Sequence, residues 1–289
     1  MKRKSSRPRI SVPQLAERID QLSTKRQEVV RPILEHPREF VLLSVRAMAK
    51  RLRTDPATIV RIVRGLGFGS YREFQRHLHD LSLAFATSLD TMQTADDNGN
   101  MPVFVRDSLE RDIKNLQGLK NSLDAQRLVA FAKRLHRARR IVVIAGDLAA
   151  YLAQYLEYQL SLIGLPIFAG TSPGRVSHLV RPLNKNDVVI AITFRRGLRQ
   201  TVEGVEQARS RGAYCVGIAD TFLSPLSRLC QEVFLASIES TTFGASYAAP
   251  IALLNALLAA CGQVRRGATL ALVKEIAEEQ RKGYRWYSA

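Results

Sequence analysis

The chain has 289 residues, 46% of them hydrophobic and 24% charged, which suits two ordinary domains and excludes an intrinsically disordered protein. Lys and Arg outnumber Asp and Glu by 43 to 26, and residues 1–80 alone hold 18 of these cations against 8 acids. This excess predicts an anionic partner, such as a phosphate backbone, for the N-terminal quarter. A generally basic proteome is the alternative explanation.

Cysteine usage and hydropathy exclude several other classes of protein. Cys215, Cys230 and Cys261 are isolated, which argues against a disulfide framework or a structural zinc site. The basic N-terminus is not followed by a signal-type apolar segment, and the longest apolar run, Ala248–Cys261, is short for a bilayer span. We expect a soluble, cytoplasmic protein without membrane contact, cofactor or metal.

The chain is expected to contain a basic arm, two domains and a linker. Residues 1–11 read as a disordered arm and 12–86 as a bundle of short amphipathic helices. Residues 87–102 are polar and turn-rich, which predicts a linker. Residues 103–289 form the second domain, which begins with two helices up to about Ala138.

Within the first domain, residues 44–67 predict a helix-turn-helix. Ser44 is placed to cap a helix from Val45 to about Leu52, and a short turn follows. Asp55 then stands at an N-cap with Pro56 at the first helical position, a pairing that both residues favour. This second helix is expected to run to about Leu66 and to stop at Gly67.

Helical periodicity gives the second helix two distinct faces. The apolar face, expected to pack inward, consists of Ile59, Ile62, Val63 and Leu66. The opposite face combines small residues with arginines, a combination typical of a helix that enters the major groove of DNA. A plain helical hairpin with a solvated charged face is the alternative. The predicted DNA-binding residues are Ser44, Lys50, Arg53, Thr54, Asp55, Ala57, Thr58, Arg61, Arg64 and Tyr71.

The segment also resembles the N-terminal domain of the RpiR/MurR family of bacterial transcription regulators. The resemblance rests on an early ILEHP, on the helix-turn-helix, and on the motif formed by Leu66, Gly67, Phe68, Tyr71, Glu73 and Phe74. It implies a winged-helix-like or homeodomain-like bundle that acts as an oligomer on a palindromic operator in double-stranded DNA.

The second domain predicts an α/β fold with a parallel sheet, because short apolar strands alternate with helices. The expected strands are Ile141–Ala145, Leu165–Phe168, Val188–Thr193, Tyr214–Ile218 and Val233–Leu235. The expected helices are Leu148–Ile163, Val176–Leu183, Gln200–Arg211, Pro225–Cys230, Tyr247–Gly262 and Ala268–Gly283.

Residues 141–236 resemble a sugar isomerase (SIS) domain, through IVVIAGDLAAYLAQYLEYQLSLIGLP, NDVVIAITFRRG and ARSRGAYCVGIAD. The resemblance implies a five-stranded parallel sheet flanked by helices, in a homodimer or homotetramer. It also implies a ligand at the carboxyl ends of the strands, where SIS domains bind a phosphosugar with a G-x-G-x-S turn and an S-x-S-G-x-T loop.

This sequence departs from both of those motifs. The first falls on residues 145–149, AGDLA, which lack the serine, and the second on residues 193–198, TFRRGL. We hypothesise that Arg195 and Arg196, with Arg199 one turn later, grip a carboxylate or phosphate instead. Asp147 would oppose a phosphate unless it pairs with an arginine. A decayed pocket with solvated arginines is the alternative.

The predicted effector-binding residues lie around these two loops and near the C-terminus. They are Gly146, Asp147, Ala149, Thr193, Phe194, Arg195, Arg196, Arg199, Glu239 and Ser240. The polar stretch that contains the last two either completes the pocket or caps the helix that follows.

The sequence therefore predicts a transcription regulator that binds DNA and is controlled by a small anionic metabolite, not an enzyme. A phosphosugar isomerase is the main alternative, with Glu239 as the single candidate base. An RNA-binding or structural scaffold is a third, which the short capped helix disfavours.

Overall fold

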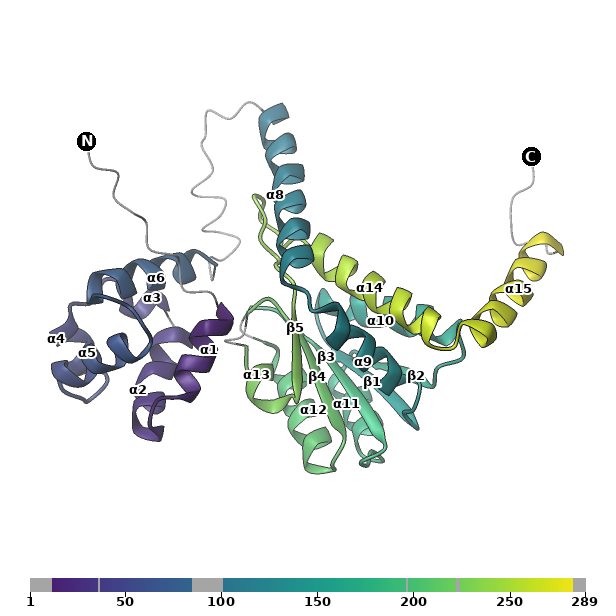
Figure 1. Ribbon diagram of the computed structural model, residues 1–289, viewed down its shortest axis with the longest axis horizontal. Coiled ribbons are helices and arrows are strands. Elements are labelled where there is room, and N and C mark those ends of the chain that lie inside the picture. The colour runs from purple at the N-terminus through teal and green to yellow at the C-terminus, as the bar shows by residue number, and fades with distance from the viewer. Residues whose placement is uncertain (1–11, 36, 85–100, 196, 222–223, 283–289) are drawn as a thin grey trace. The chain divides into compact units, whose positions relative to one another are not determined.

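The computed structural model describes residues 12–35, 37–84, 101–195, 197–221 and 224–282 (Figure 1). Backbone contacts divide the chain into two compact units, Met1–Asp97 and Asn98–Ala289. Each unit is considered by itself.

The described part of the first unit is built from helices. They are α1 (Val12–Asp20), α2 (Thr24–Glu35), α3 (Pro37–Phe40), α4 (Val45–Arg51), α5 (Pro56–Gly65) and α6 (Tyr71–Ala84). Its core consists of buried apolar side chains from all six of these helices, including Leu15, Ile33, Phe40, Met48, Ile62 and Phe74. No strand occurs among the described residues between 12 and 84, so of the two bundles that the resemblance implies, the homeodomain-like one fits.

The second unit has the predicted α/β fold, with five parallel strands in the order β2-β1-β3-β4-β5. The strands are β1 (Arg140–Ala145), β2 (Ile167–Gly170), β3 (Asp187–Ile192), β4 (Tyr214–Ala219) and β5 (Glu232–Leu235). The helices are α8 (Met101–Ser122), α9 (Ala125–Leu135), α10 (Ala149–Ser161), α11 (Pro173–Val180), α12 (Arg199–Ser210), α13 (Leu226–Leu229), α14 (Ala248–Val264) and α15 (Arg266–Lys282).

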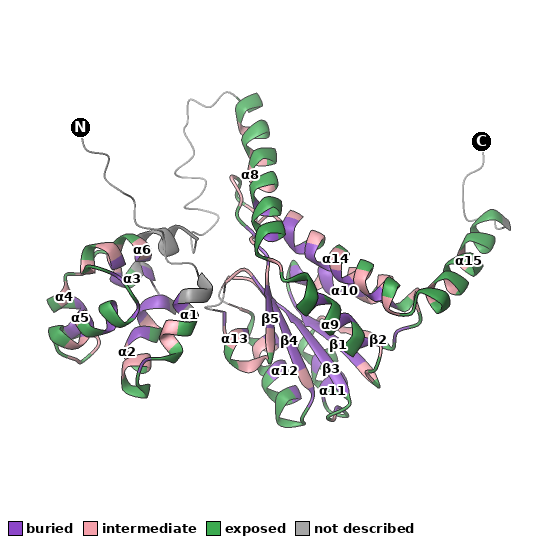
Figure 2. Ribbon diagram, in the orientation of Figure 1, coloured by how far each residue is buried: buried purple, intermediate pink, exposed green. Residues whose placement is uncertain are grey.

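Side chains alternate between the two faces of the sheet, so each strand supplies two cores. Ile141 and Val143 of β1 pack in one core with α9, α10 and α14, and Val142 and Ile144 pack in the other with α11, α12 and α13. Figure 2 shows the strands buried between these layers. A sheet covered on both faces explains why its strands are apolar throughout instead of alternating with polar residues.

Two predicted elements are shifted in the structure. The second strand was expected at Leu165–Phe168, but the N–H of Leu165 donates to the Leu160 carbonyl at the end of α10, and Pro166 has no N–H. Pairing therefore begins at Ile167. The next helix begins at Pro173 instead of Val176, because Ser172 takes the N-cap position and proline the first helical position.

The strand order reverses between β1 and β3, because the chain leaves β1 toward β2 on one side and returns to β3 on the other. In open α/β sheets such a switch point forms a crevice outside the carboxyl ends of the strands, where ligands bind. The turn after β1 and the loop after β3 meet there.

Within the described residues no single helix is long and apolar enough to cross a membrane, although α14 and α15, bent by 107° at their junction, pass that test as a pair.

Candidate functional sites

The helix-turn-helix is held by two side-chain caps. The Ser44 hydroxyl accepts a hydrogen bond from the Ala47 N–H at 3.2 Å, at the start of α4. At the start of α5, the carboxylate of Asp55 accepts from the Thr58 N–H at 2.8 Å and from the Thr58 hydroxyl at 2.6 Å. These hydrogen bonds, the hydroxyl's first, lower the pKa of Asp55 and keep it ionised. Both predicted caps are confirmed.

The turn between α4 and α5 is tight and regular. Arg53 adopts a left-handed backbone conformation with φ of 52°, and the Thr54 N–H donates to the Ala49 carbonyl at 2.9 Å. Lys50, near the end of α4, and Arg53, in the turn, are exposed, and Thr54 is half-buried. The turn thus fixes how α5 leaves α4.

Helix α5 has the two faces that its periodicity predicts. Ile59, Ile62 and Val63 are buried, as is Leu66 at the C-cap. On the other side Ala57, Arg61 and Arg64 are exposed, and Thr58, whose hydroxyl donates to Asp55, is half-buried. The exposed face is therefore cationic and free of large side chains near its N-terminus, as insertion into a major groove requires.

The residues of the family motif stabilise the bundle behind this face. Tyr71 donates its hydroxyl to the Leu43 carbonyl at 2.7 Å, and burial raises the pKa of Tyr71 to about 12. The buried rings of Phe68 and Phe74 lie 5.3 Å apart. The hydrogen bond to Leu43 gives Tyr71 a structural role in the bundle, and its predicted role in DNA binding stays a prediction.

Gly67 shows why the motif needs glycine. Its φ is 86°, and a Cβ there would lie 1.7 Å from Nη1 of Arg18, which donates to the Leu66 carbonyl at 3.0 Å. Glycine therefore lets α1 close over the end of α5.

The second candidate site lies at the carboxyl ends of β1 and β3. After β1, Gly146 is buried, Asp147 is exposed with φ of 51°, and Ala149 begins α10. A Cβ on Gly146 would lie 2.2 Å from Nε2 of Gln200 and 2.9 Å from Cδ1 of Leu198. The two side chains at the start of α12 thus fill the space above this turn, and the Gln200 amide donates to the Ala145 carbonyl at 3.3 Å.

The loop after β3 is fixed from within. The buried Thr193 hydroxyl accepts from the Leu198 N–H at 3.1 Å, and the Arg195 N–H donates to Oδ1 of Asp220 at 3.0 Å. Arg195 and Gly197 have positive φ values of 58° and 76°. Thr193 therefore keeps the hydroxyl of the SIS loop but uses it to shape the loop. Arg196 lies outside the described residues.

Charged and aromatic groups from distant segments converge beside this loop. The rings of Phe194 and Tyr247 lie 5.3 Å apart. Burial raises the pKa of Tyr247 to about 12, with Asp147 and Asp220 adding to the shift and Arg195 opposing it. Burial also raises the pKa of the Asp220 carboxyl. The structure thus brings Asp147, Phe194 and Arg195 together with two residues that the sequence analysis missed, Asp220 and Tyr247.

A signal in the sequence exists for one of the missed residues. Asp220 directly follows β4, and polar residues after parallel strands gather at one edge of the sheet. Tyr247 and Gln200 carry no such signal, because they reach the site from the starts of α14 and α12.

Three predicted effector residues lie in other contacts. Arg199 is 89% exposed and faces Glu203, 4.0 Å away along α12. Glu239 pairs with Arg111 of α8 at 2.8 Å, and Ser240 is bonded to Thr242. Their predicted role in ligand binding stays a prediction.

Helix α8 is joined to the segment that follows β5. Asn115, which is buried, donates to the Glu239 carbonyl at 2.8 Å and accepts from the Ser237 hydroxyl at 2.9 Å. The Ser246 hydroxyl donates to Asp112, which lies one turn before Asn115 on α8. It also accepts from the Ala248 N–H at the start of α14. Because Tyr247 comes next to Ser246, contacts run without a break from the β3 loop to α8.

Comparison with known proteins assigns both units. Residues 11–84 match the helix-turn-helix domain of the rpiR family, and residues 134–260 match the SIS domain. The chain is 25% identical over 222 residues to the HTH-type transcriptional regulator HexR of Pseudomonas aeruginosa, covering 76% of this chain and 77% of that protein.

Solved structures agree with the fold. The sugar isomerase domain of an RpiR transcription factor from Sphaerobacter thermophilus is 25% identical, with a TM-score of 0.58, and covers 62% of this chain and 99% of its own. The NanR protein of Vibrio vulnificus, solved with ManNAc-6P, has a TM-score of 0.59 at 20% identity, and covers 94% of this chain and 99% of its own.

Proposed function

Because this chain belongs to the RpiR-type family of transcription regulators, which join a helix-turn-helix to a SIS domain, we propose that it binds an operator in double-stranded DNA under the control of a small anionic metabolite. The observation that carries the DNA-binding part is the outward face of α5. Arg61 and Arg64 are exposed there, while the opposite face is buried in the core.

Two or four copies would hold paired recognition helices about one DNA turn, roughly 34–36 Å, apart on a palindromic operator. Exposed Ala57 leaves room for the first turn of α5 to approach base edges, and the arginines further along reach guanine or phosphate. Lys50 and Arg53 are available for backbone phosphates on the approach side.

The DNA-binding proposal is tested by fluorescence anisotropy with the protein's own upstream region and with random duplex. Arg61→Ala is expected to weaken operator binding by about 1–3 kcal/mol while changing random-duplex binding little, if Arg61 reads a base. Lys120→Ala, an exposed cation on α8, serves as the matched control and should leave both affinities unchanged. An unaltered preference for the operator in Arg61→Ala would remove Arg61 from base recognition.

We further propose that the effector lies at the carboxyl ends of β1 and β3, with Arg195 as its anion-binding group. Its guanidinium lies near Tyr247 and Asp220, so the site offers a cation, a hydroxyl and an aromatic face together. The two carboxylates of Asp147 and Asp220 favour a ligand that also carries hydroxyl donors. A sugar phosphate or sugar acid has both features, and ManNAc-6P, with which NanR was solved, is one such compound.

Calorimetric titration with sugar phosphates, sugar acids and keto acids tests the anion site. Arg195→Ala is expected to lose binding, whereas Arg211→Ala, an exposed arginine at the other end of α12, should bind as the wild type does. Equal affinities of wild type and Arg195→Ala for every compound would show that Arg195 does not bind the anion.

Occupation of this site would reach α8 through the contacts described above. A ligand that shifts the β3 loop acts on Phe194, hence on Tyr247, and then on the hydrogen bond between Ser246 and Asp112 of α8. To control operator affinity, the ligand must bind one arrangement of α8 more tightly than another.

The isomerase alternative gains no support from the geometry. Its candidate base, Glu239, is paired with Arg111, and its side chain is 58% exposed. An isomerase needs a carboxylate held over a bound sugar instead.

A further inference from the structure

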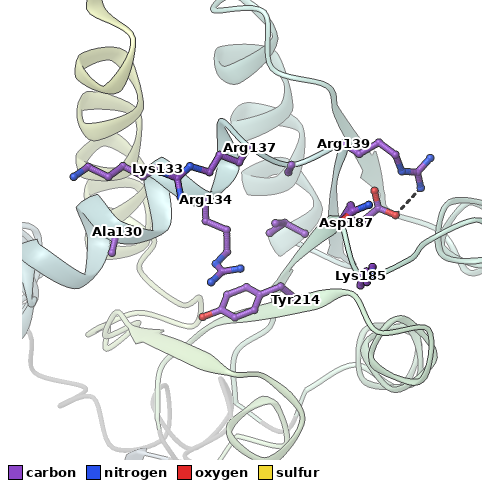
Figure 3. A pocket seen from close by; sticks show the side chains of 11 residues that line it. Ala130, Lys133, Arg134, Arg137, Arg139, Lys185, Asp187 and Tyr214 are labelled. Atoms are coloured by element: carbon purple, nitrogen blue, oxygen red, sulfur yellow. Dashed lines mark hydrogen bonds and ion pairs between the residues drawn. The ribbon is translucent and has the colours of Figure 1, made fainter.

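The amino ends of the strands, opposite to the proposed effector site, form a basic hollow (Figure 3) of about 720 Å³. Its floor is Tyr214, the first residue of β4. One wall is the end of α9 with the turn that leads into β1, and the other is the loop before β3. The walls carry five cations, Lys133, Arg134, Arg137, Arg139 and Lys185.

The hollow holds one carboxylate against these five cations. Asp187 is 1% exposed, and its Oδ2 accepts from Arg139 at 2.6 Å and from the Asn184 N–H at 2.7 Å. Asp187 therefore neutralises the charge of one arginine at most. Glu232, behind Tyr214, accepts the Tyr214 hydroxyl and pairs with Arg127 at 3.6 Å, outside the hollow.

The remaining cations form no ion pair within the part of the chain that the structure describes. Among the described residues, no carboxylate lies within ion-pair distance of Lys133, Arg134, Arg137 or Lys185. Positive charge at the end of a helix is common because it complements the helix dipole, and this explains Lys133 and Arg134 in the last turn of α9. It does not explain Arg137 on the turn or Lys185 on a separate loop.

The two walls are joined and preorganised. Arg139 donates through its side chain to the Pro182 carbonyl at 3.1 Å, and its N–H donates to the Asn186 carbonyl at 2.9 Å. The guanidinium of Arg134 lies over the Tyr214 ring (Figure 3), with its carbon 3.8 Å from the ring centroid, and this contact orients the side chain. The hollow is thus an open depression lined by exposed cations from two segments, with Arg134 and Arg139 held by the contacts above.

We propose that this hollow binds a small polyanion with two or more adjacent phosphate groups. Guanidinium groups hold phosphate oxygens in bidentate fashion, and Lys185 adds a point charge from the opposite wall. The volume suits a metabolite, since small-molecule sites measure about 300–1,000 Å³. The site is distinct from the effector site, roughly 20 Å away along six-residue β3.

Titration of the full-length protein with inorganic tripolyphosphate, at about 150 mM salt to screen diffuse attraction, tests the proposal. The double variant Arg137→Gln with Lys185→Gln should weaken binding about tenfold or more, the effect of losing charge-assisted contacts. The control Arg266→Gln with Lys274→Gln removes the same charge from exposed positions on α15 and should bind as wild type does. ATP in a parallel titration distinguishes a nucleotide from bare phosphates: tighter binding than tripolyphosphate supports a nucleotide, and equal binding supports recognition of the phosphates alone.

Two results would overturn the proposal. Equal weakening in both double variants would show general charge attraction, and unchanged tripolyphosphate binding with weakened binding of random duplex would make the surface a DNA contact. Arg195→Ala should keep tripolyphosphate binding, because that variant alters the other end of the sheet, so failure of the effector site and failure of this site are separable.

Discussion

The outward face of α5 and the loop after β3 both present arginines to an expected anion, yet their arginines are positioned in different ways. On α5, Arg61 and Arg64 are set by a capped helix and by apolar residues of the same helix that turn the opposite face inward. At the β3 loop, Arg195 is held by Asp220 after β4 and lies near Tyr247 at the start of α14.

This difference shows that one site is encoded locally and the other is assembled. The two faces of α5 follow from residues within a few turns of one another, although its buried face packs against other helices of the bundle. The candidate effector site draws on segments far apart in the chain, among them those of Asp147, Arg195 and Tyr247, so a change in any of them is expected to alter its charge or shape. The following experiments test that comparison, from the largest expected effect to the smallest.

Ile62→Ala is expected to lower the free energy of unfolding by about 2–5 kcal/mol, because Ile62 is fully buried in the bundle. The adjacent Arg61→Ala should change that free energy by less than about 0.5 kcal/mol, since Arg61 is exposed. Urea unfolding of both variants measures the contrast. Similar small effects of the two would mean that α5 is not oriented by its own periodicity.

Asn115→Ala is expected to destabilise the second unit by about 1–3 kcal/mol, because it removes a buried side chain that makes two hydrogen bonds and leaves part-buried groups of the 237–239 segment without their partner. Lys114→Ala, on the exposed side of α8, should stay within about 0.5 kcal/mol of wild type. If α8 transmits the effector signal, Asn115→Ala should also reduce the change in operator affinity that the effector causes, in an anisotropy titration with and without effector. If Asn115→Ala keeps the full change in operator affinity, α8 does not transmit the effector signal.

Asp55→Ala should lower the Tm by a few degrees through loss of the N-cap of α5, and Asp55→Asn should recover most of it. The pKa of Asp55 is lowered by its hydrogen bonds with Thr58, so its contribution is present above the ordinary value of 3.8 and is lost as the pH falls through the lower folded pKa. Thermal unfolding of wild type and Asp55→Ala should therefore differ fully at neutral pH and converge in strong acid. A constant difference down to pH 2 would contradict an ionised cap.

Gly146→Ala is expected to cost about 0.5–1.5 kcal/mol, because the new Cβ displaces Gln200 from its hydrogen bonds to the Ala145 and Thr171 carbonyls. Gln200→Ala in the same chain should remove the clash, so the double variant should lose less than the sum of the two single changes. Additive losses in urea unfolding would mean that Gln200 does not fill this turn.

Much of the fold was predictable because its signals are local. The apolar runs of β1, β3 and β4 and the Asp-Pro start of α5 fall within one or two residues of their predicted positions. The errors occurred at the ends of elements, where a neighbouring element or a helix cap decides the boundary. Leu165 completes the end of α10 instead of beginning β2, and the start of α11 follows its Ser-Pro cap instead of its apolar pattern.

The candidate sites divide in the same way. The two faces of α5 follow from a period of 3.6 residues, and the altered residues 145–149 and 193–198 were found from their spacing along the chain. Asp220 could have been found from its place directly after β4, whereas the positions of Tyr247 and Gln200 were not predictable, because they depend on which helices start beside the β3 loop. Glu239 belongs to the same class, since its pairing with Arg111 spans 128 residues.

The sequence by itself determined which segments are helices and strands, which flank of α5 turns outward, and that the SIS loops have lost hydroxyls and gained arginines. These properties depend on neighbours within a few residues. Only the tertiary structure decided that Thr193 shapes its own loop, that Asn115 joins α8 to the segment after β5, and that cations from two segments face one hollow at the amino ends of the strands. Such arrangements arise from strand order and packing, which bring together groups that are far apart in the chain.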